Sequence, residues 1–313
     1  MCFVLAAPPP RSVPGTVLRR PAPVRELTIR YRSHTGAMRS AIVLLPSWYG
    51  RRDDPAIPLV ISPHGRGIDA ADNAGRWGGL PTRGGFAVVN PMGQGRRLKL
   101  YSWGDPGQID DLARMPTFLH RALPWLRIDR RRIYAFGGSM GGQESLLLAA
   151  RDAHLLAGVV AFDAPVDLAL RYRDFAHLRH GSRLRRLARI EVGGAPQQDP
   201  RAYEIRSPLD FARRLAFSGV PLQIWFSRID RVVVDARRQS ELLCREILAF
   251  DPRAPLVEVA GAWHHDAELR WDTGLPAALR LFGLLPGAWH VPGTVSGQPR
   301  RAAIAASTSS GVL

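Results

Sequence analysis

Lysine is nearly missing from this chain of 313 residues, in which Lys99 is the single lysine. The formal net charge of +16 therefore comes from arginine, and a charge of this size raises nucleic acid or an anionic membrane surface as partners. The arginines are accompanied by heavy use of alanine, glycine and proline, which is the composition that GC-rich codons produce. We therefore expect no nucleic-acid partner and no dedicated polyanion site.

Cysteine and long apolar runs are also scarce. Cys2 and Cys244 are the only cysteines, too few for a disulfide framework. No apolar run approaches the roughly 20 residues that cross a bilayer, so we expect no membrane span. The opening MCFVLAAPPP has a short apolar patch with no basic region before it, which argues against a signal peptide. We expect a cytoplasmic protein, or a secreted one if the true N-terminus lies upstream.

Composition divides the chain into a folded body and two tails. Residues 1–24 are rich in proline and arginine, and residues 287–313 in glycine, serine, threonine and alanine. Both patterns predict disordered tails. Residues 25–286 have the length and apolar content of one α/β domain.

The body alternates between short apolar runs and helical patterns. The apolar runs cover residues 57–63, 85–91, 132–138, 156–163, 221–227 and 255–261. Runs of this kind, without polar alternation, are typical of strands buried on both faces of a parallel sheet. Helical patterns fall at about 111–126, 140–152, 235–250 and 274–284, with Asp235 placed to cap the third. An alternating stretch from Leu27 and a second run at AIVLLP predict an N-terminal antiparallel hairpin. The sequence therefore predicts an α/β fold with a mostly parallel central sheet and helices on both faces.

Residues 168–220 interrupt this alternation. The segment is longer than a connection between two strands needs, so we predict a small cap or lid. Its stretch RYRDFAHLRHGSRLRRLAR is helical and basic. These arginines could bind an acidic ligand, but we favour a solvated helix face.

Ser139 stands in the densest glycine cluster of the chain, AFGGSMGGQE. Gly137 to Gly141 fit the pattern G-x-S-x-G, which marks a nucleophilic serine when it follows a buried strand and opens a helix. Both conditions are met, because RIYAF precedes the motif and an apolar helical pattern follows it. We expect Ser139 to lie on a tight strand-to-helix turn and to act as a nucleophile.

A serine nucleophile needs a base, and the base needs an orienting acid. Asp230 follows the strand at 221–227, and we favour it as the acid over Asp163, which ends the preceding strand. His264 and His265 follow the last strand and are both candidates for the base. The stretch HHD, residues 264–266, is a possible but weak metal motif. No second cluster of ligands stands at a metal-binding spacing from it, so we expect no metal and no cofactor.

Donors for the oxyanion of an acyl-transfer reaction should come from two backbone N–H groups. One is that of Met140, which follows the nucleophile. The other is that of Arg66, in the stretch PHGRG after the first parallel strand. In this reading His64 shapes the loop and is not a second base.

Together these motifs resemble the serine hydrolases of the α/β-hydrolase superfamily, in the branch of prolyl oligopeptidase-like peptidases and related bacterial esterases. The resemblance covers residues 25–285 and rests on PHGRG, IDRRRIYAFGGSMGGQE, RSPLDFA, PLQIWFSRIDRVV and GAWHHDAE. It implies the α/β-hydrolase fold, with Ser139 as nucleophile, Asp230 as acid and His265 as base. His265 is chosen because its spacing from Trp263 and Glu268 is similar to that of relatives reading Gly-x-Trp-x-His-x-x-Glu.

The predicted function is hydrolysis of a carboxylic ester through an acyl-enzyme intermediate. A prolyl oligopeptidase-like peptidase acting on short peptides would use the same residues. The chain has no room for the β-propeller of the large members, which favours the esterase. A catalytically silent basic binding protein on the same fold is the alternative from another class. Trp103 and the 168–220 segment are candidate walls of the substrate pocket.

Overall fold

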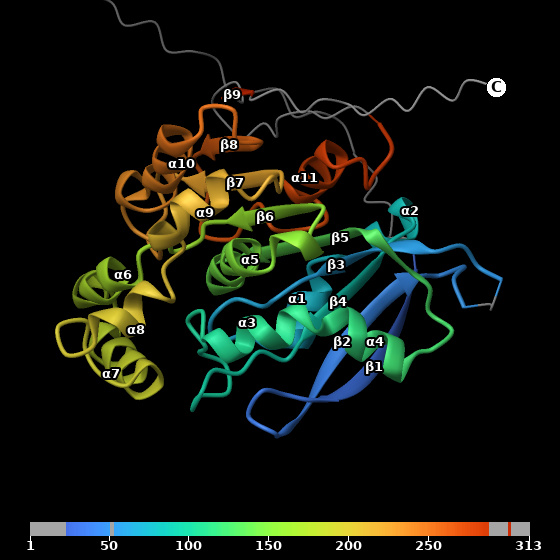
Figure 1. Ribbon diagram of the computed structural model, residues 1–313, viewed down its shortest axis with the longest axis horizontal. Coiled ribbons are helices and arrows are strands. Elements are labelled where there is room, and N and C mark those ends of the chain that lie inside the picture. Colours follow the sequence, from blue (N-terminus) through green and yellow to red (C-terminus); the bar gives the residue numbers. More distant parts are fainter. Residues whose placement is uncertain (1–22, 51–52, 288–299, 302–313) are drawn as a thin grey trace, which may run out of the picture.

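The computed structural model describes residues 23–50, 53–287 and 300–301. Their strands form one sheet in the order β1-β2-β4-β3-β5-β6-β7-β8-β9 (Figure 1). Pairing is parallel from β4 through β3 to β8 and antiparallel at β1–β2, β2–β4 and β8–β9. The strands are β1 (Val24–Arg32), β2 (Met38–Pro46), β3 (Ile57–Ile61), β4 (Ala87–Pro91), β5 (Ile128–Gly138), β6 (Gly158–Phe162), β7 (Leu222–Ser227), β8 (Leu256–Gly261) and β9 (Arg300–Arg301).

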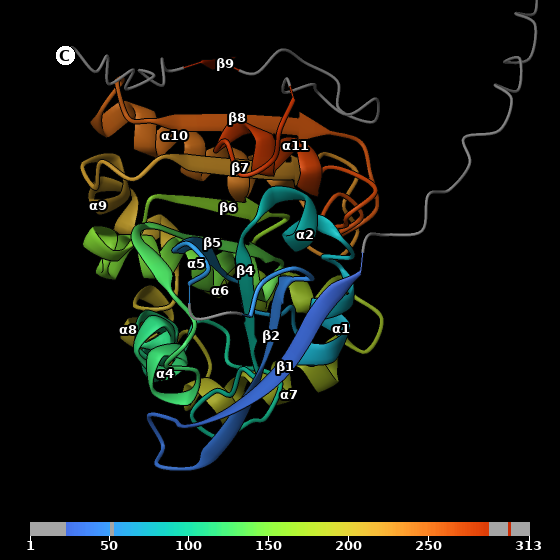
Figure 2. The ribbon, with the colours of Figure 1, turned by 90° about the vertical axis from the view of Figure 1, so that its right-hand side faces the viewer.

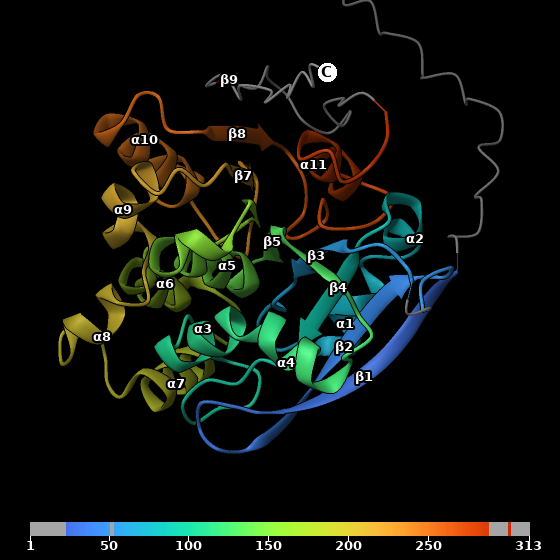
Figure 3. The ribbon, with the colours of Figure 1, turned by 45° about the vertical axis from the view of Figure 1, so that its right-hand side comes forward.

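The predicted N-terminal hairpin is confirmed. β1 and β2 pair from Val24 opposite Pro46 to Arg32 opposite Met38. Ile29 and Tyr31 of β1 are buried, whereas the residues between and beside them are exposed, as the alternating sequence requires of a strand with one solvated face. Figure 3 shows the hairpin at one edge of the sheet, far from β8 near the other.

The six predicted parallel strands are confirmed as β3 to β8. Successive residues of each strand enter cores on opposite faces of the sheet. In β3, for example, Leu59 and Ile61 lie in one core and Val60 in the other. Burial on both faces explains why these runs are apolar without alternation.

Helices cover both faces of the sheet (Figure 2). In that view α1 and α2 lie to the right of the sheet, and α4 and α9 to the left. The α-helices are α1 (Ala70–Gly75), α2 (Leu80–Gly84), α3 (Pro106–Ala113), α4 (Met115–Ala122), α5 (Met140–Arg151), α6 (Leu168–Asp174), α7 (Gly181–Val192), α8 (Pro200–Glu204), α9 (Ala212–Ala216), α10 (Ser240–Phe250) and α11 (Leu275–Leu281). The 3-10 turns are η1 (Ala153–Leu155), η2 (Phe175–His177), η3 (Pro208–Phe211) and η4 (Ala236–Arg238).

Two of the helix predictions need correction. The pattern at 111–126 is two helices, α3 and α4, separated at Arg114. Proline lies in the first turn of each, and proline is tolerated there because its missing N–H is not needed. The region 235–250 begins with η4, and α10 starts only at Ser240. Asp235 has a left-handed backbone (φ 57°) and its side chain caps no N–H group of η4, so its expected capping role was wrong.

The predicted tails lie mostly outside the described residues, which exclude 1–22, 288–299 and 302–313. Val24, which we assigned to the N-terminal tail, instead begins β1. Arg300 and Arg301, within the predicted C-terminal tail, pair with β8. Among the described residues, none of the helices combines the length and apolar character needed to cross a bilayer.

The segment 168–220 carries α6 to α9. The helices α6, α7 and α8 share a small core with Trp103 that is separate from the two sheet cores, and Figure 1 shows them gathered at the lower left. Glu191 of α7 accepts the N–H groups of Arg97 and Leu98 at 2.9 and 2.8 Å, which fastens these helices to the loop after β4. The end of the segment, α9, packs into the sheet core instead. The function of residues 168–220 as a cap remains a prediction.

Candidate active site

Ser139 lies where β5 ends and α5 begins, on a strained turn. Its φ of 53° and ψ of −123° are unusual for a residue with a side chain, and such strain persists only where the surrounding structure imposes it. The Ser139 N–H donates to the carbonyl of Phe162 at 2.8 Å, which ties the turn to β6. The predicted strand–turn–helix context of the serine is therefore confirmed.

The glycines around Ser139 are required by close backbone contacts. A Cβ on Gly137 would lie 2.2 Å from the carbonyl oxygen of Gly141, and one on Gly141 would lie 2.1 Å from that of Pro63. Both distances are below any real Cβ contact, and the atoms met are backbone. The two glycines of the motif thus let β5, α5 and the loop after β3 meet at the serine.

The loop that carries the histidine pair packs on the same turn. A Cβ on Gly138, directly before the serine, would lie 2.6 Å from Oδ1 of Asp266 and 2.6 Å from Cδ2 of Leu269. That same oxygen of Asp266 lies 3.9 Å from Nε2 of His265. The Nε2 edge of His265 is therefore close to the turn of Ser139. Among the described residues no hydrogen bond joins the side chains of Ser139 and His265.

Asp230 and His265 form a hydrogen bond across two loops. Oδ2 of Asp230, after β7, lies 2.6 Å from Nδ1 of His265, after β8. The other carboxylate oxygen accepts the N–H groups of Val232 and Val233 at 2.6 and 3.2 Å. The carboxylate of Asp230 is thus held in place and orients the imidazole of His265 through Nδ1, so that Nε2 does not contact this carboxylate.

His264 is turned away from this pair. Its side chain is exposed, whereas that of His265 is only 16% exposed. The histidine joined to Asp230 is therefore the one that the spacing from Trp263 indicated.

Asp163, the competing acid, has a different set of partners. It accepts the N–H of Ser227, the indole N–H of Trp263 and the N–H of Asp266, each at 2.9 Å. Burial, above all, and the neighbouring carboxylates raise the pKa of Asp163, whereas the charge of His265 lowers it. The net result is a pKa of about 7. Asp163 therefore connects the end of β7 to the histidine loop and makes no hydrogen bond to the imidazole within the described residues.

Three carboxylates surround His265 and decide its protonation. Burial by itself lowers the pKa of His265, but the charge of Asp266, the hydrogen bond and charge of Asp230 and the charge of Asp163 raise it to about 9. Arg76 partly offsets this field, because its Nη1 lies 3.3 Å from Oδ2 of Asp266. An open hollow of about 460 Å³ borders His265, Asp266 and Arg76.

Asp163, His265 and Asp266 also bring ligand atoms within 4.8 Å of one another, as a metal site would. The contacts already described use much of this donor set: Asp163 accepts three hydrogen bonds, and Asp266 pairs with Arg76. A cation in the cluster would meet the guanidinium of Arg76 close by. The arrangement thus fits a charged support for the histidine better than it fits a metal centre.

The loop after β3 lies against the first turn of α5. A Cβ on Gly65 would lie 3.7 Å from the carbonyl oxygen of Gly138, so the N–H of Arg66 belongs to the same small region as that of Met140. His64 is buried, with Nδ1 2.8 Å from the carbonyl of Gly65, and Nε2 accepts the N–H of Gly93 at 2.9 Å. Burial lowers the pKa of His64, which keeps the ring neutral. These contacts support the expected loop-shaping function of His64.

Sequence reasoning missed three charged residues near this site. Asp266 was seen only as part of a weak metal motif, although its place directly after the histidines was a usable signal. Arg76 carried no signal, because α1 reaches the site only through the fold. Arg171 was assigned to a solvated helix face, which is wrong for this residue, since it is 3% exposed. Its neighbour Arg173 is exposed, as expected.

Comparisons with known proteins place the fold. No family model matches the chain, and no curated protein sequence matches it. Solved structures do. S-formylglutathione hydrolase from Staphylococcus aureus matches with a TM-score of 0.59 and 16% identity, over 83% of this chain and 99% of that one. A Mycobacterium tuberculosis puromycin-hydrolyzing peptidase matches with a TM-score of 0.62 and 20% identity, over 87% of this chain and 41% of that one. Pyrococcus horikoshii acylaminoacyl peptidase matches with a TM-score of 0.61 and 15% identity, over 83% and 40%.

At these identities the similarity concerns the fold alone. The chain has the α/β-hydrolase fold, with a mostly parallel sheet covered by helices, as its sequence predicted. It spans about 40% of the length of the two peptidases and nearly all of the S-formylglutathione hydrolase.

Proposed function

We propose that this protein is a serine hydrolase that cleaves a carboxylic ester through a Ser-His-Asp triad and an acyl-enzyme intermediate. One observation carries the proposal. A 2.6 Å hydrogen bond joins Asp230 to His265, whose loop packs against the strained turn of Ser139. Nucleophile, acid and base thus follow the carboxyl ends of β5, β7 and β8, three strands of the same parallel part of the sheet.

In the acylation step Oγ of Ser139 attacks the carbonyl carbon of the ester, and Nε2 of His265 accepts the hydroxyl proton. The negative charge moves to the carbonyl oxygen, where the N–H groups of Met140 and Arg66 stabilise it. Asp230 holds the imidazole in orientation and stabilises its charged form. When the tetrahedral intermediate collapses, the ester C–O bond breaks and the alcohol leaves with the proton from His265.

In the deacylation step a water molecule takes the place of the alcohol. His265 accepts a proton from the water, whose oxygen attacks the acyl carbon. Collapse breaks the bond to Ser139, which recovers its proton from the imidazole. The products are an alcohol and a carboxylic acid, and the balance needs neither a cofactor nor a metal.

A peptidase acting on short peptides is the second candidate. It is supported by the similarity to two peptidases, whereas the match along nearly the whole of S-formylglutathione hydrolase supports acyl transfer from a small molecule. A binding protein that lacks catalysis is less well supported. Strain like that of Ser139 costs about 1–3 kcal/mol, and it is typical of functional sites.

Covalent labelling with a fluorophosphonate tests the proposal. We expect wild type and Ser182→Ala, a control at an exposed serine of α7, to be labelled, and Ser139→Ala to resist labelling. Labelling that persists in Ser139→Ala, or is absent from wild type, would contradict the assignment. Hydrolysis of 4-nitrophenyl butanoate without cleavage of the matched 4-nitroanilide supports an esterase, and comparable turnover of both supports the peptidase.

The histidine pair offers a matched test of the base. His265→Gln should lower kcat by at least about 10³-fold, because it removes the proton acceptor. The kcat of His264→Gln should remain within about twofold of wild type, since substitutions at exposed positions without a structural role have small effects. The reverse result would make His264 the base.

A further inference from the structure

Arg171 is a buried cation with an unused donor. It lies on α6, the helix after β6, and is 3% exposed. Its guanidinium stacks on Phe175 at 4.7 Å from the ring centroid. Its buried Nη1 has no hydrogen-bond partner within residues 23–50, 53–287 and 300–301. Because an unsatisfied buried donor on a charged group is costly, this is a position where a ligand acceptor would be stabilised.

A second cation, Arg66, lies close enough for its charge to act on Arg171. Burial is the largest cause that lowers the pKa of Arg171, and the neighbouring charge of Arg66 lowers it further, to about 10. Asp174 and Asp230 act in the opposite direction. Because arginine stays charged at neutral pH, the two guanidiniums repel each other. An anion between them would relieve the repulsion.

The two nearby carboxylates do not fill that role. Asp230 is already engaged with His265 and with two backbone N–H groups. Asp174 forms no ion pair with Arg171 within 4.0 Å in the described part of the chain. The guanidinium of Arg171 thus has charge neighbours but no bound acceptor at Nη1.

Packing connects this cation pair to the turn of Ser139. The ring of Phe175, beneath Arg171, lies 6.4 Å from that of Trp103, which lies 5.6 Å from that of Tyr101. The Trp103 N–H points to the sulfur of Met140 at 3.3 Å, directly after the serine. The hydroxyl of Tyr101 would lie 3.5 Å from a Cβ on Gly67, beside Arg66. Packing thus links Arg171, on α6, and Arg66, in the loop after β3, to the turn of Ser139.

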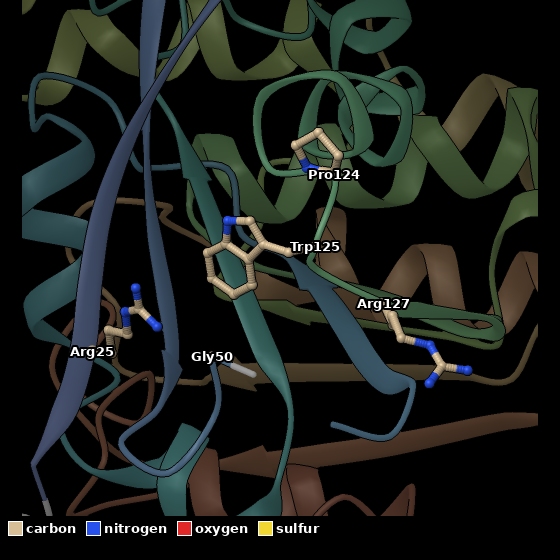
Figure 4. Close-up of a pocket in the computed structure, with 5 residues that line it drawn as sticks. All are labelled: Arg25, Gly50, Pro124, Trp125 and Arg127. Atoms are coloured by element: carbon tan, nitrogen blue, oxygen red, sulfur yellow. The ribbon is translucent and has the colours of Figure 1, made fainter. Parts of the chain in front are cut away.

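A second pair of arginines, Arg25 and Arg127, lacks the features that Arg66 and Arg171 share. Arg25 and Arg127 line an open hollow of about 630 Å³ with Trp125, at the amino ends of the parallel strands (Figure 4). Arg25 donates to the carbonyl of Tyr49, and Arg127 to that of Asp54. Figure 4 shows the Arg127 side chain pointing away from Arg25 and Trp125. These arginines are partnered, do not converge and lie at the end of the sheet opposite to that where such folds bind ligands.

We propose that Arg66 and Arg171 bind a carboxylate of the substrate, so that the enzyme acts on esters that carry an anionic group near the scissile bond. This inference rests on the proposed hydrolase function. Arginine suits the task because its planar fork pairs with both oxygens of a carboxylate. The carboxylate can belong to the acyl group or to the alcohol, and these two arrangements are separated by the experiment.

The experiment compares isosteric charged and neutral esters. Monoethyl succinate and ethyl succinamate carry the difference on the acyl side, and 3-acetoxypropanoate and its amide carry it on the alcohol side. With hydrolysis followed by pH-stat, we expect wild type to prefer the anionic member of one pair by about 10- to 100-fold in kcat/KM, the usual worth of a charge-assisted hydrogen bond. Arg171→Met should lower that preference at least tenfold. Arg173→Met removes the same charge from an exposed position of the same helix and should leave the preference unchanged.

Equal rates on both members of both pairs, or a preference that Arg171→Met leaves intact, would overturn the inference. Binding separates its failure from that of the hydrolase proposal. By calorimetry, Ser139→Ala should bind the anionic ester of the preferred pair at least tenfold more tightly than the amide, whether or not the protein is catalytic. If Arg171→Met does not fold, Arg171→Lys serves instead, because it keeps the charge and loses the fork. It should retain part of the preference, and full retention would contradict the bidentate contact.

Discussion

Asp266→Asn should make the enzyme more active at neutral pH. The carboxylate of Asp266 is the largest cause that raises the pKa of His265, and its Oδ1 lies 3.9 Å from Nε2 of the imidazole. Asparagine has the same shape and tolerates the left-handed backbone of this residue (φ 59°). The backbone N–H that donates to Asp163 is retained. The substitution therefore removes the negative charge, and with it the ion pair with Arg76, without changing the shape of the side chain.

The distance sets the size of the effect. Two unit charges about 4 Å apart interact by roughly 1 kcal/mol in bulk water and about 4 kcal/mol near a protein surface. Arg76 cancels part of the field of Asp266, so we take the lower end, about 1.4 kcal/mol, which corresponds to about one pKa unit. A base must be neutral to accept a proton, and His265 with a pKa of about 9 is mostly protonated at pH 7. Lowering the pKa by about one raises the neutral fraction at pH 7 by up to about tenfold.

The assay is the pH dependence of kcat/KM, which reports ionisations of the free enzyme. In wild type the rate should rise with pH through an apparent pKa well above 6.5, and in Asp266→Asn this rise should move to lower pH. Arg76→Met should shift the profile in the opposite direction. It leaves the charge of Asp266 uncompensated, so the rise of kcat/KM should move to higher pH. Profiles that coincide in all three proteins, or shifts of the same sign in both variants, would refute the electrostatic reasoning.

Three further outcomes are expected. Asp230→Asn should lower kcat by about 10⁴-fold. Asp163→Asn should mainly lower stability, by about 1–3 kcal/mol in urea unfolding, because it disturbs three hydrogen bonds to a buried carboxylate, and a larger kcat loss in Asp163→Asn would exchange their roles. Gly141→Ala should destabilise the fold by about 1–3 kcal/mol and abolish fluorophosphonate labelling, since its Cβ would lie 2.1 Å from the carbonyl oxygen of Pro63. Burial raises the pKa of Glu144 from 4.5 to about 8, so its contribution to stability is full below pH 4.5 and is lost as pH rises through 8. In Glu144→Gln the decline of Tm over this pH range should be smaller than in wild type.

Much of the fold could be predicted from the sequence because each strand records its surroundings locally. Leu59, Val60 and Ile61 are apolar in succession because neighbouring positions of β3 enter different cores. The two glycines of the serine motif are explained by backbone contacts within and beside the turn. The helix boundaries were less accurate, because the left-handed backbone of Asp235 and the break at Arg114 depend on the packing around them.

The sequence alone determined the strand order along the chain, the glycine-lined turn at Ser139 and the presence of acids and histidines after the right strands. Only the tertiary structure decided which of them meet. The bond between Asp230 and His265 joins residues 35 positions apart, and that between Asp163 and Asp266 joins residues 103 apart. Likewise Arg171 is buried although it lies in a basic stretch, and its guanidinium stacks on Phe175. Periodicity reports which face of an element is buried, but the partner of a polar side chain is set by the loops that the sheet brings to one edge.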